Sequence, residues 1–156
     1  MTPEEEAFVE AMGQTLGSSG MTPMSGRMWG WLLICDPPEQ SAEDLATALH
    51  ASRGAISGTA RLLSDAGLIR RTTRRGDRKE YFSAPPETFT TLLRGAGRIY
   101  RRFREVTEHG LAALADRPPE ARARIQEVHD SFAFVEREVP ILVERYLRDR
   151  VASAEK

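Results

Sequence analysis

The chain has 156 residues, of which 40% are hydrophobic and 29% are charged, and its formal net charge is −1 at pH 7. This length suits one ordinary domain or a small domain with an oligomerisation arm, and the composition excludes disorder throughout the chain. The longest uninterrupted apolar run, Trp31 to Cys35, has five residues, far short of the roughly 20 that a membrane helix needs.

Two helices are predicted in the first 35 residues. The first, over about 3–16, has Thr2 as its cap and Glu5 in position to complete a capping box. A glycine- and serine-rich break follows, and Thr22-Pro23 repeats the start signal for a second helix that ends near Cys35. The acidic first ten residues do not have the pattern of a signal peptide.

Two shorter helices are predicted next. Ser41 starts a helix that ends near His50, and Ser52 starts one that runs to about Ala66. His50 stands where the turn between such helices often has glycine, but histidine tolerates left-handed geometry, so we expect the turn to form. The helical period places three apolar side chains of the later helix inward: Ile56, Ala60 and Leu63.

A hairpin with a basic tip is predicted after Gly67, which is placed to end the preceding helix. Residues 68–73 and 80–83 have strand character, and residues 74–79 form the turn between them. Arginine and lysine dominate that turn.

Two long helices are predicted over about 87–115 and 119–150, separated by Asp116-Arg117-Pro118. Pro140 is expected to kink the later one. Apolar residues repeat at spacings of three and four along it, as in a coiled-coil seam. A helix of roughly 30 residues is a rod of about 45 Å, too long for a small core to cover, so we predict a homodimer. The predicted interface residues are Phe8, Ile125, Val128, Phe132, Val135, Val139, Leu142 and Tyr146.

The predicted fold is therefore mainly α, a winged helix-turn-helix with long helices that form a dimerisation arm. Residues 1–21 form an N-terminal helix that contributes to the dimer interface. Residues 22–84 form the winged helix-turn-helix domain, and residues 85–156 form the helical dimerisation region.

Charge is distributed unevenly along the chain, and its pattern indicates a nucleic-acid-binding module. Residues 1–49 carry one arginine against eight acidic residues, whereas residues 50–83 carry eight basic residues against three acidic ones. Small residues on the outer face of the helix after Ser52 let its backbone approach bases, arginine can grip guanine, and the basic turn can reach phosphate or the minor groove. The predicted DNA contacts are Ser41, Ser52, Arg53, Gly54, Ser57, Gly58, Arg61, Arg74, Arg75, Arg78 and Lys79.

The same segments resemble a known family of regulators. Ser52-Arg53-Gly54-Ala55-Ile56-Ser57 and Gly76-Asp77-Arg78-Lys79-Glu80-Tyr81-Phe82 look like the MarR family, in particular its GbsR-like branch. The resemblance covers about residues 22–84, and the long helices match in layout only. It implies a homodimer on a pseudo-palindromic operator and control by a small molecule. We expect a repressor, although the sequence itself does not distinguish repression from activation.

Three further candidate sites have competing interpretations. Cys35, the single cysteine, is a redox sensor or a buried structural thiol, and no neighbouring cation in the sequence favours the sensor. Glu105 with His109, and His129 with Asp130, are conceivable metal ligands or ordinary surface residues. Four aromatic side chains are either plain core or a cage for a cationic effector between the DNA-binding module and the long helices. They are Trp29, Trp31, Tyr100 and Phe103.

No phosphate-binding glycine loop, nucleophile elbow or cluster of metal ligands is visible in the sequence, so we expect neither an enzyme nor a cofactor. The competing hypothesis is a winged helix used only for contacts with other proteins, and the basic wing argues against it. A single cysteine excludes an intrachain disulfide and favours a reducing, cytoplasmic location.

Overall fold

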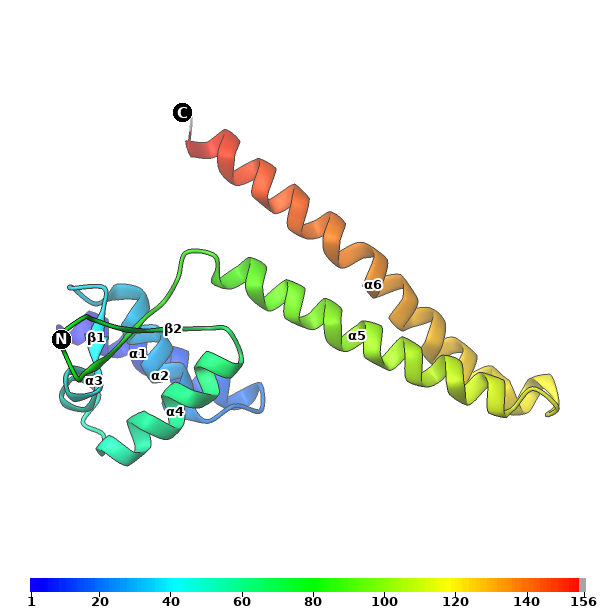
Figure 1. Ribbon diagram of the computed structural model, residues 1–156, viewed down its shortest axis with the longest axis horizontal. Coiled ribbons are helices and arrows are strands. Elements are labelled where there is room, and N and C mark those ends of the chain that lie inside the picture. The colour runs from blue at the N-terminus through cyan, green and yellow to red at the C-terminus, as the bar shows by residue number, and fades with distance from the viewer. Residues whose placement is uncertain (155–156) are drawn as a thin grey trace. The chain divides into compact units, whose positions relative to one another are not determined.

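The computed structural model describes residues 1–154. In chain order, its elements are α1 (Pro3–Ser18), α2 (Pro23–Ile34), β1 (Gln40–Ser41), α3 (Ala42–Ala48), α4 (Arg53–Asp65), β2 (Arg70–Thr73), β3 (Glu80–Ser83), α5 (Thr88–Ala113) and α6 (Pro119–Ala154) (Figure 1). The chain divides into two compact units at residues 88 and 89. Across the described residues, no helix is both long and apolar enough to cross a membrane.

The predicted fold class is confirmed, and the local signals that predicted the helices are present as hydrogen bonds. At α1 the Glu5 amide donates to Thr2 Oγ1 (3.2 Å) and the Thr2 amide donates to Glu5 Oε2 (2.7 Å). At α3 the same reciprocal pair joins Ser41 and Asp44. Each box satisfies amide groups that the first turn of a helix leaves without partners.

Helices α1 and α2 cross at closely packed glycines. A Cβ atom on Gly26 would overlap the carbonyl oxygen of Met12, and one on Gly30 would lie 2.9 Å from Met12 Cβ. A Cβ on Gly13 would lie 2.8 Å from Cγ of Arg27. Small residues at these positions let the two backbones approach more closely than side chains would permit.

The core of the first unit lies among α2, α3 and α4. Its largest fully buried side chains include Met28, Leu45, Leu49, Ile56 and Leu63. The predicted inward face of α4 is confirmed, since Ile56, Ala60 and Leu63 are all buried. The turn between α3 and α4 also forms as predicted, and His50 adopts the left-handed φ of 50°.

A three-stranded antiparallel sheet with the order β1-β3-β2 closes this unit. Strand β1, which the sequence did not predict, pairs Gln40 with Phe82 and Ser41 with Tyr81. Two residues are too few to show a strand period. Leu68 and Ile69, which the sequence placed in the hairpin, precede β2 as buried residues.

The second unit is the helical hairpin of α5 and α6, whose ribbons meet at the turn after α5 and diverge away from it (Figure 1). Phe132 stacks on Phe103 with ring centroids 4.9 Å apart. Tyr146 meets Phe89 edge to face at 4.6 Å, closer to the open ends of the pair. Helix α6 extends through Pro140 to Ala154, four residues beyond the predicted end.

Candidate nucleic-acid interface

The outer face of α4 is polar, small and exposed. Arg53, Ser57, Gly58 and Arg61 are all exposed, on the face opposite the buried apolar positions. A Cβ atom on Gly58 would meet nothing within 4 Å, so the helix backbone is open to an approaching molecule there. This geometry suits a helix that lies in the major groove, where base edges are read.

The N-terminus of α4 is also accessible. Ser52 caps it by accepting a hydrogen bond from the Ala55 amide (3.1 Å), and Ser52, Arg53 and Gly54 are exposed. The amides of a first helical turn, together with the helix dipole, favour a phosphate group.

Ser41 does not share this exposure, although the sequence placed it among the DNA contacts. It is 3% exposed, pairs with β3 and donates its hydroxyl to Asp44 Oδ2 (2.6 Å). That hydrogen bond and one from the Ser41 amide lower the pKa of the Asp44 carboxyl. The side chain is occupied as the cap of α3, so we leave it out of the candidate interface.

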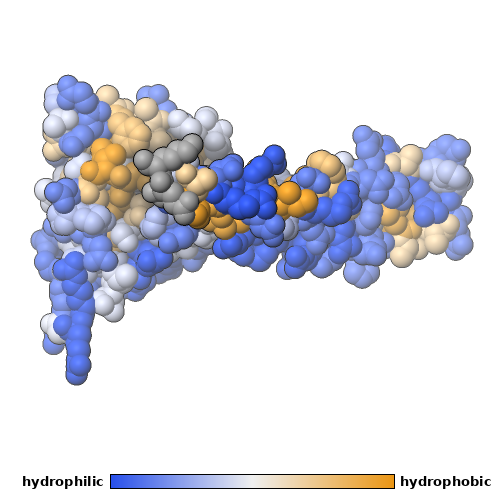
Figure 2. Space-filling view, turned by 90° about the horizontal axis from the view of Figure 1, so that it is seen from above, coloured by the Kyte–Doolittle hydropathy of each residue, from blue (hydrophilic) through white to orange (hydrophobic). Residues whose placement is uncertain are grey.

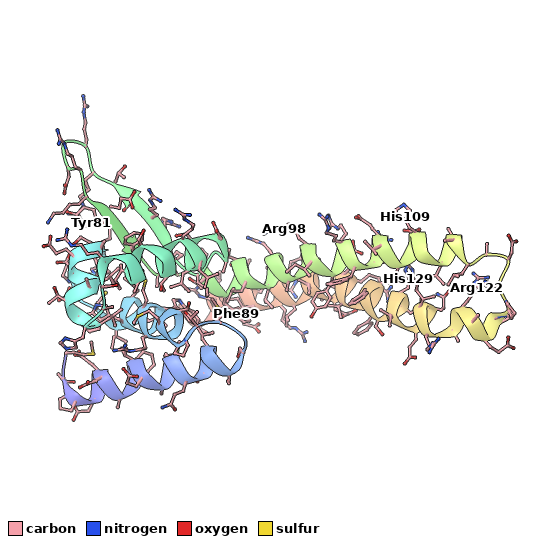
Figure 3. All side chains as sticks on the ribbon, turned by 90° about the horizontal axis from the view of Figure 1, so that it is seen from below. Tyr81, Phe89, Arg98, His109, Arg122 and His129 are labelled. Carbon is pink, nitrogen blue, oxygen red and sulfur yellow. The ribbon has the colours of Figure 1, made fainter. Side chains whose placement is uncertain are left out.

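The turn of the hairpin, which we call the wing tip (residues 74–79), is ordered by side-chain bonds. Tyr81 donates its hydroxyl to Asp77 Oδ2 (2.7 Å), and the Lys79 amide donates to Asp77 Oδ1 (2.9 Å). Both bonds lower the pKa of the Asp77 carboxyl, and the bond from the Lys79 amide has the larger effect. The guanidinium of Arg74 lies over the Tyr81 ring, 4.0 Å from its centroid, and Figure 3 labels Tyr81 in the hairpin.

Arg75 and Arg78 lie at the wing tip with exposed side chains. Within residues 1–154 neither has an ion-pair partner, and the same holds for Arg61 on α4. These three guanidinium groups are therefore free to meet phosphate or base edges.

Two carboxylates beside the interface were not singled out from the sequence. Glu39 accepts from Arg74 Nη2 at 2.9 Å, and this bond raises the pKa of Arg74. Glu43 on α3 contacts Arg53 Nη2 at 3.2 Å and Lys79 Nζ at 3.5 Å. The partners are 10 to 36 residues apart in the chain, so no local spacing signals them.

The remaining predicted sites have ordinary surroundings. Cys35 is buried, and burial raises the pKa of its thiol, which favours the structural interpretation over the sensor. His109 bonds the Glu105 carbonyl through Nδ1, and His129 bonds Thr107. The described part of the chain contains no group of three side chains that could hold a metal ion.

The four aromatic residues that the sequence left as either plain core or an effector cage have these environments within their own units. Trp29 and Trp31 are half-buried, and their indole nitrogens have no hydrogen-bond partner among residues 1–154. Tyr100 and Phe103 both contact the ring of Phe132. The cage stays a prediction.

The predicted dimer seam of α6 is used partly within the chain. Phe132 and Tyr146 meet aromatic rings of α5, and the side chains of Ile125 and Val139 lie beside glycines of α5. A set of large apolar side chains, which includes Val128 and Leu142 of the predicted seam, is left exposed on the two helices, and Figure 2 shows orange patches along them. It comprises Phe89, Ile99, Phe103, Val106, Val128, Phe134, Ile141, Leu142, Leu147 and Val151. Whether the seam also contacts a second subunit stays a prediction.

The chain is similar to known regulators over almost its whole length. A model of the MarR family matches residues 32–81, and a model described as MmpR5-like MarR family transcriptional regulator matches residues 87–149. The HTH-type transcriptional regulator MmpR5 of Mycobacterium tuberculosis is 42% identical over 144 residues, which are 92% of this chain and 87% of that protein. A crystal structure described as a transcriptional regulator is 41% identical, with a TM-score of 0.86 over 94% of this chain and 99% of that one. These matches do not confirm the GbsR-like branch, because the more specific model is the MmpR5-like one.

Proposed function

The chain belongs to the MarR family of transcriptional regulators, and on that premise we propose that it represses transcription as a homodimer bound to a pseudo-palindromic operator. The observation that carries the proposal is the exposed outer face of α4 beside the wing tip. The two surfaces supply the two kinds of contact that sequence-specific binding needs. On α4, Ser57 and Gly58 are small enough to let bases approach, and Arg61 can make a bidentate contact with a base. At the wing tip, Arg75 and Arg78 offer unpaired cations to phosphates.

A second subunit is proposed because the long helices expose apolar area that one chain leaves in water. Ile99 is 59% exposed, Val106 is 62% exposed and Phe134 is 55% exposed. Large apolar side chains exposed in this way on a pair of helices are typical of an interface between subunits. A two-fold dimer also presents two copies of α4 to one face of a duplex, which explains a palindromic site.

We also propose that a small molecule tunes DNA binding by preferring one separation of the two DNA-binding units of the dimer. A ligand shifts such an equilibrium only through its difference in affinity for the two arrangements. The candidate contacts remain Trp29, Trp31, Tyr100 and Phe103. Tryptophan fluorescence and operator affinity are expected to change together when the effector is titrated.

Selection of bound sequences from a pool of random duplex DNA tests the proposed function. Enrichment of an inverted repeat with half-sites about one helical turn apart, near 10 base pairs, is the expected result. Binding should also weaken steeply as salt is raised. If no sequence is enriched, and if binding to all duplexes is absent at low salt, the proposal is wrong, and the alternative of a winged helix that contacts only proteins is favoured.

A further inference from the structure

Glu43 lies between the two surfaces that are proposed to meet DNA. Its Oε1 atom is 3.2 Å from Arg53 Nη2 at the start of α4, and its Oε2 atom is 3.5 Å from Lys79 Nζ in the wing tip. The three side chains, with Ser57, line a cavity of about 340 Å³ between α4 and the hairpin. One carboxylate on α3 therefore pairs with a cation from each half of the interface.

These ion pairs are weak enough to exchange. The side chains of Arg53, Glu43 and Lys79 are 79%, 57% and 57% exposed. Exposed pairs of this kind contribute little to folding stability. Arg53 and Lys79 can therefore leave Glu43 at little cost in folding stability, and a phosphate group can replace the carboxylate as their partner.

We propose that Glu43 is a specificity-determining residue, an internal counterion that weakens binding to DNA which offers only phosphates. The inference rests on the proposed function of this face. On a random sequence, Arg53 and Lys79 give up the carboxylate of Glu43 and gain DNA phosphates. Glu43 is then left without ion-pair partners beside the negatively charged DNA. On the operator, Arg53 gains base contacts that offset this loss, because a bidentate arginine–guanine pair discriminates strongly between bases.

The exchange also changes how binding responds to salt. A cation that meets a phosphate normally releases a condensed counterion from the DNA. When that cation leaves Glu43, the freed carboxylate takes up a cation from solution, so fewer ions are released in total. Glu43 is therefore expected to flatten the plot of log K against log salt for random DNA.

The test is Glu43→Gln, which keeps the shape of the side chain and removes its charge. Fluorescence anisotropy would measure the affinity of the full-length protein for a random duplex and for the enriched operator between about 50 and 300 mM salt, where the Debye length is roughly 14 Å down to 6 Å. The variant is expected to bind the random duplex about two- to ten-fold more tightly, with a salt slope steeper by up to about one. Affinity for the operator should rise less, so the ratio of the two affinities should fall.

Glu10→Gln is the matched control, because Glu10 also pairs with an arginine, Arg27, at 2.7 Å. It lies on α1, on the side of its unit away from the hairpin (Figure 3). This control changes the net charge equally and should leave the ratio unchanged. In a protein that carries Arg53→Ala and Lys79→Ala, the effect of Glu43→Gln on random DNA should shrink.

Three outcomes would overturn the inference. The affinity and salt slope of Glu43→Gln on random DNA could equal those of the unmodified protein, which would leave the proposed function standing. The substitution could act equally in the presence and absence of Arg53 and Lys79, which would make Glu43 a source of general repulsion. If the unmodified protein bound neither duplex, both the inference and the proposed function would fail.

Discussion

Gly26 lies so close to Met12 that a methyl group on its α-carbon would overlap the Met12 carbonyl oxygen. The contact is backbone against backbone, so no side chain can rotate to make room. Gly26→Ala is expected to reduce the free energy of unfolding by roughly 1–3 kcal/mol or more, because α2 must move away from α1. Urea denaturation followed by circular dichroism would measure this. Gly58→Ala is the control, since its Cβ would meet open space and alanine favours a helix by up to about 1 kcal/mol over glycine.

The wing tip is expected to supply much of the salt dependence of DNA binding. Replacing Arg74, Arg75 and Arg78 with alanine should weaken binding to all duplexes similarly and reduce the salt slope by up to about 2.7, or about 0.9 for each phosphate that the protein no longer neutralises. Arg74 should contribute least of the three, because it already pairs with Glu39. Single substitutions measured by anisotropy would rank them. A triple variant with the parent's slope would show that the wing does not touch DNA.

Sequence discrimination is expected to depend on α4. Arg53→Ala or Arg61→Ala should cost roughly 1–3 kcal/mol on the operator if the arginine reads a guanine. The loss on random DNA should be smaller. Binding isotherms on both duplexes at one salt concentration separate the cases, and equal losses would assign the side chain to phosphate.

The carboxyl of Asp44 links stability to pH. Hydrogen bonds from the Ser41 hydroxyl and amide lower its pKa below the ordinary value of 3.8. Its contribution is therefore complete above pH 3.8 and is lost as the pH falls through the lower pKa of the folded state. Asp44→Asn should reduce the melting temperature at pH 7, and the difference from the unmodified protein should shrink at about pH 3 and below. A difference in melting temperature that stayed constant with pH would mean that the charge of Asp44 does not contribute to the stability of the cap.

The long helices are expected to hold two subunits together. Full-length protein should have the mass of a dimer at micromolar concentration in multi-angle light scattering, and removal of residues 119–156 should leave a chain that aggregates or unfolds. Phe134→Glu, at an exposed apolar position of α6, should favour the monomer. Val143, which is buried on the same helix and was not predicted at the interface, offers a comparison: its substitution should reduce stability in monomer and dimer alike.

How far the sequence predicts this structure depends on how local each signal is. The caps at Thr2, Ser41 and Ser52 were all predicted, because a cap involves residues three apart. The buried face of α4 was also predicted from residues close together in the chain, because the helical period places Ile56, Ala60 and Leu63 on one side. Strand β1 was not, because it forms through partners some 40 residues away.

The candidate site divides in the same way. The exposed cations of α4 and the wing tip could be predicted from the local excess of positive charge and from the helical period. Their pairing with Glu39 and Glu43 could not, because it depends on the tertiary fold. The apolar period of α6 predicted a buried seam but not its partner. Phe132 and Tyr146 contact α5 of the same chain, and a heptad pattern alone does not distinguish a neighbouring helix from a second subunit.

Because β3 is the central strand of the sheet, the length of the hairpin can change independently of the packing of the core. Phe82 is held by Gln40 on one side and Arg71 on the other, and it is buried. Residues 74–79 lie beyond both pairings. Insertions of two residues at that turn would extend the hairpin while keeping the inward and outward alternation of its strands. Over evolution, or in an engineered variant, the hairpin can therefore grow or shorten without any change in how α4 is seated.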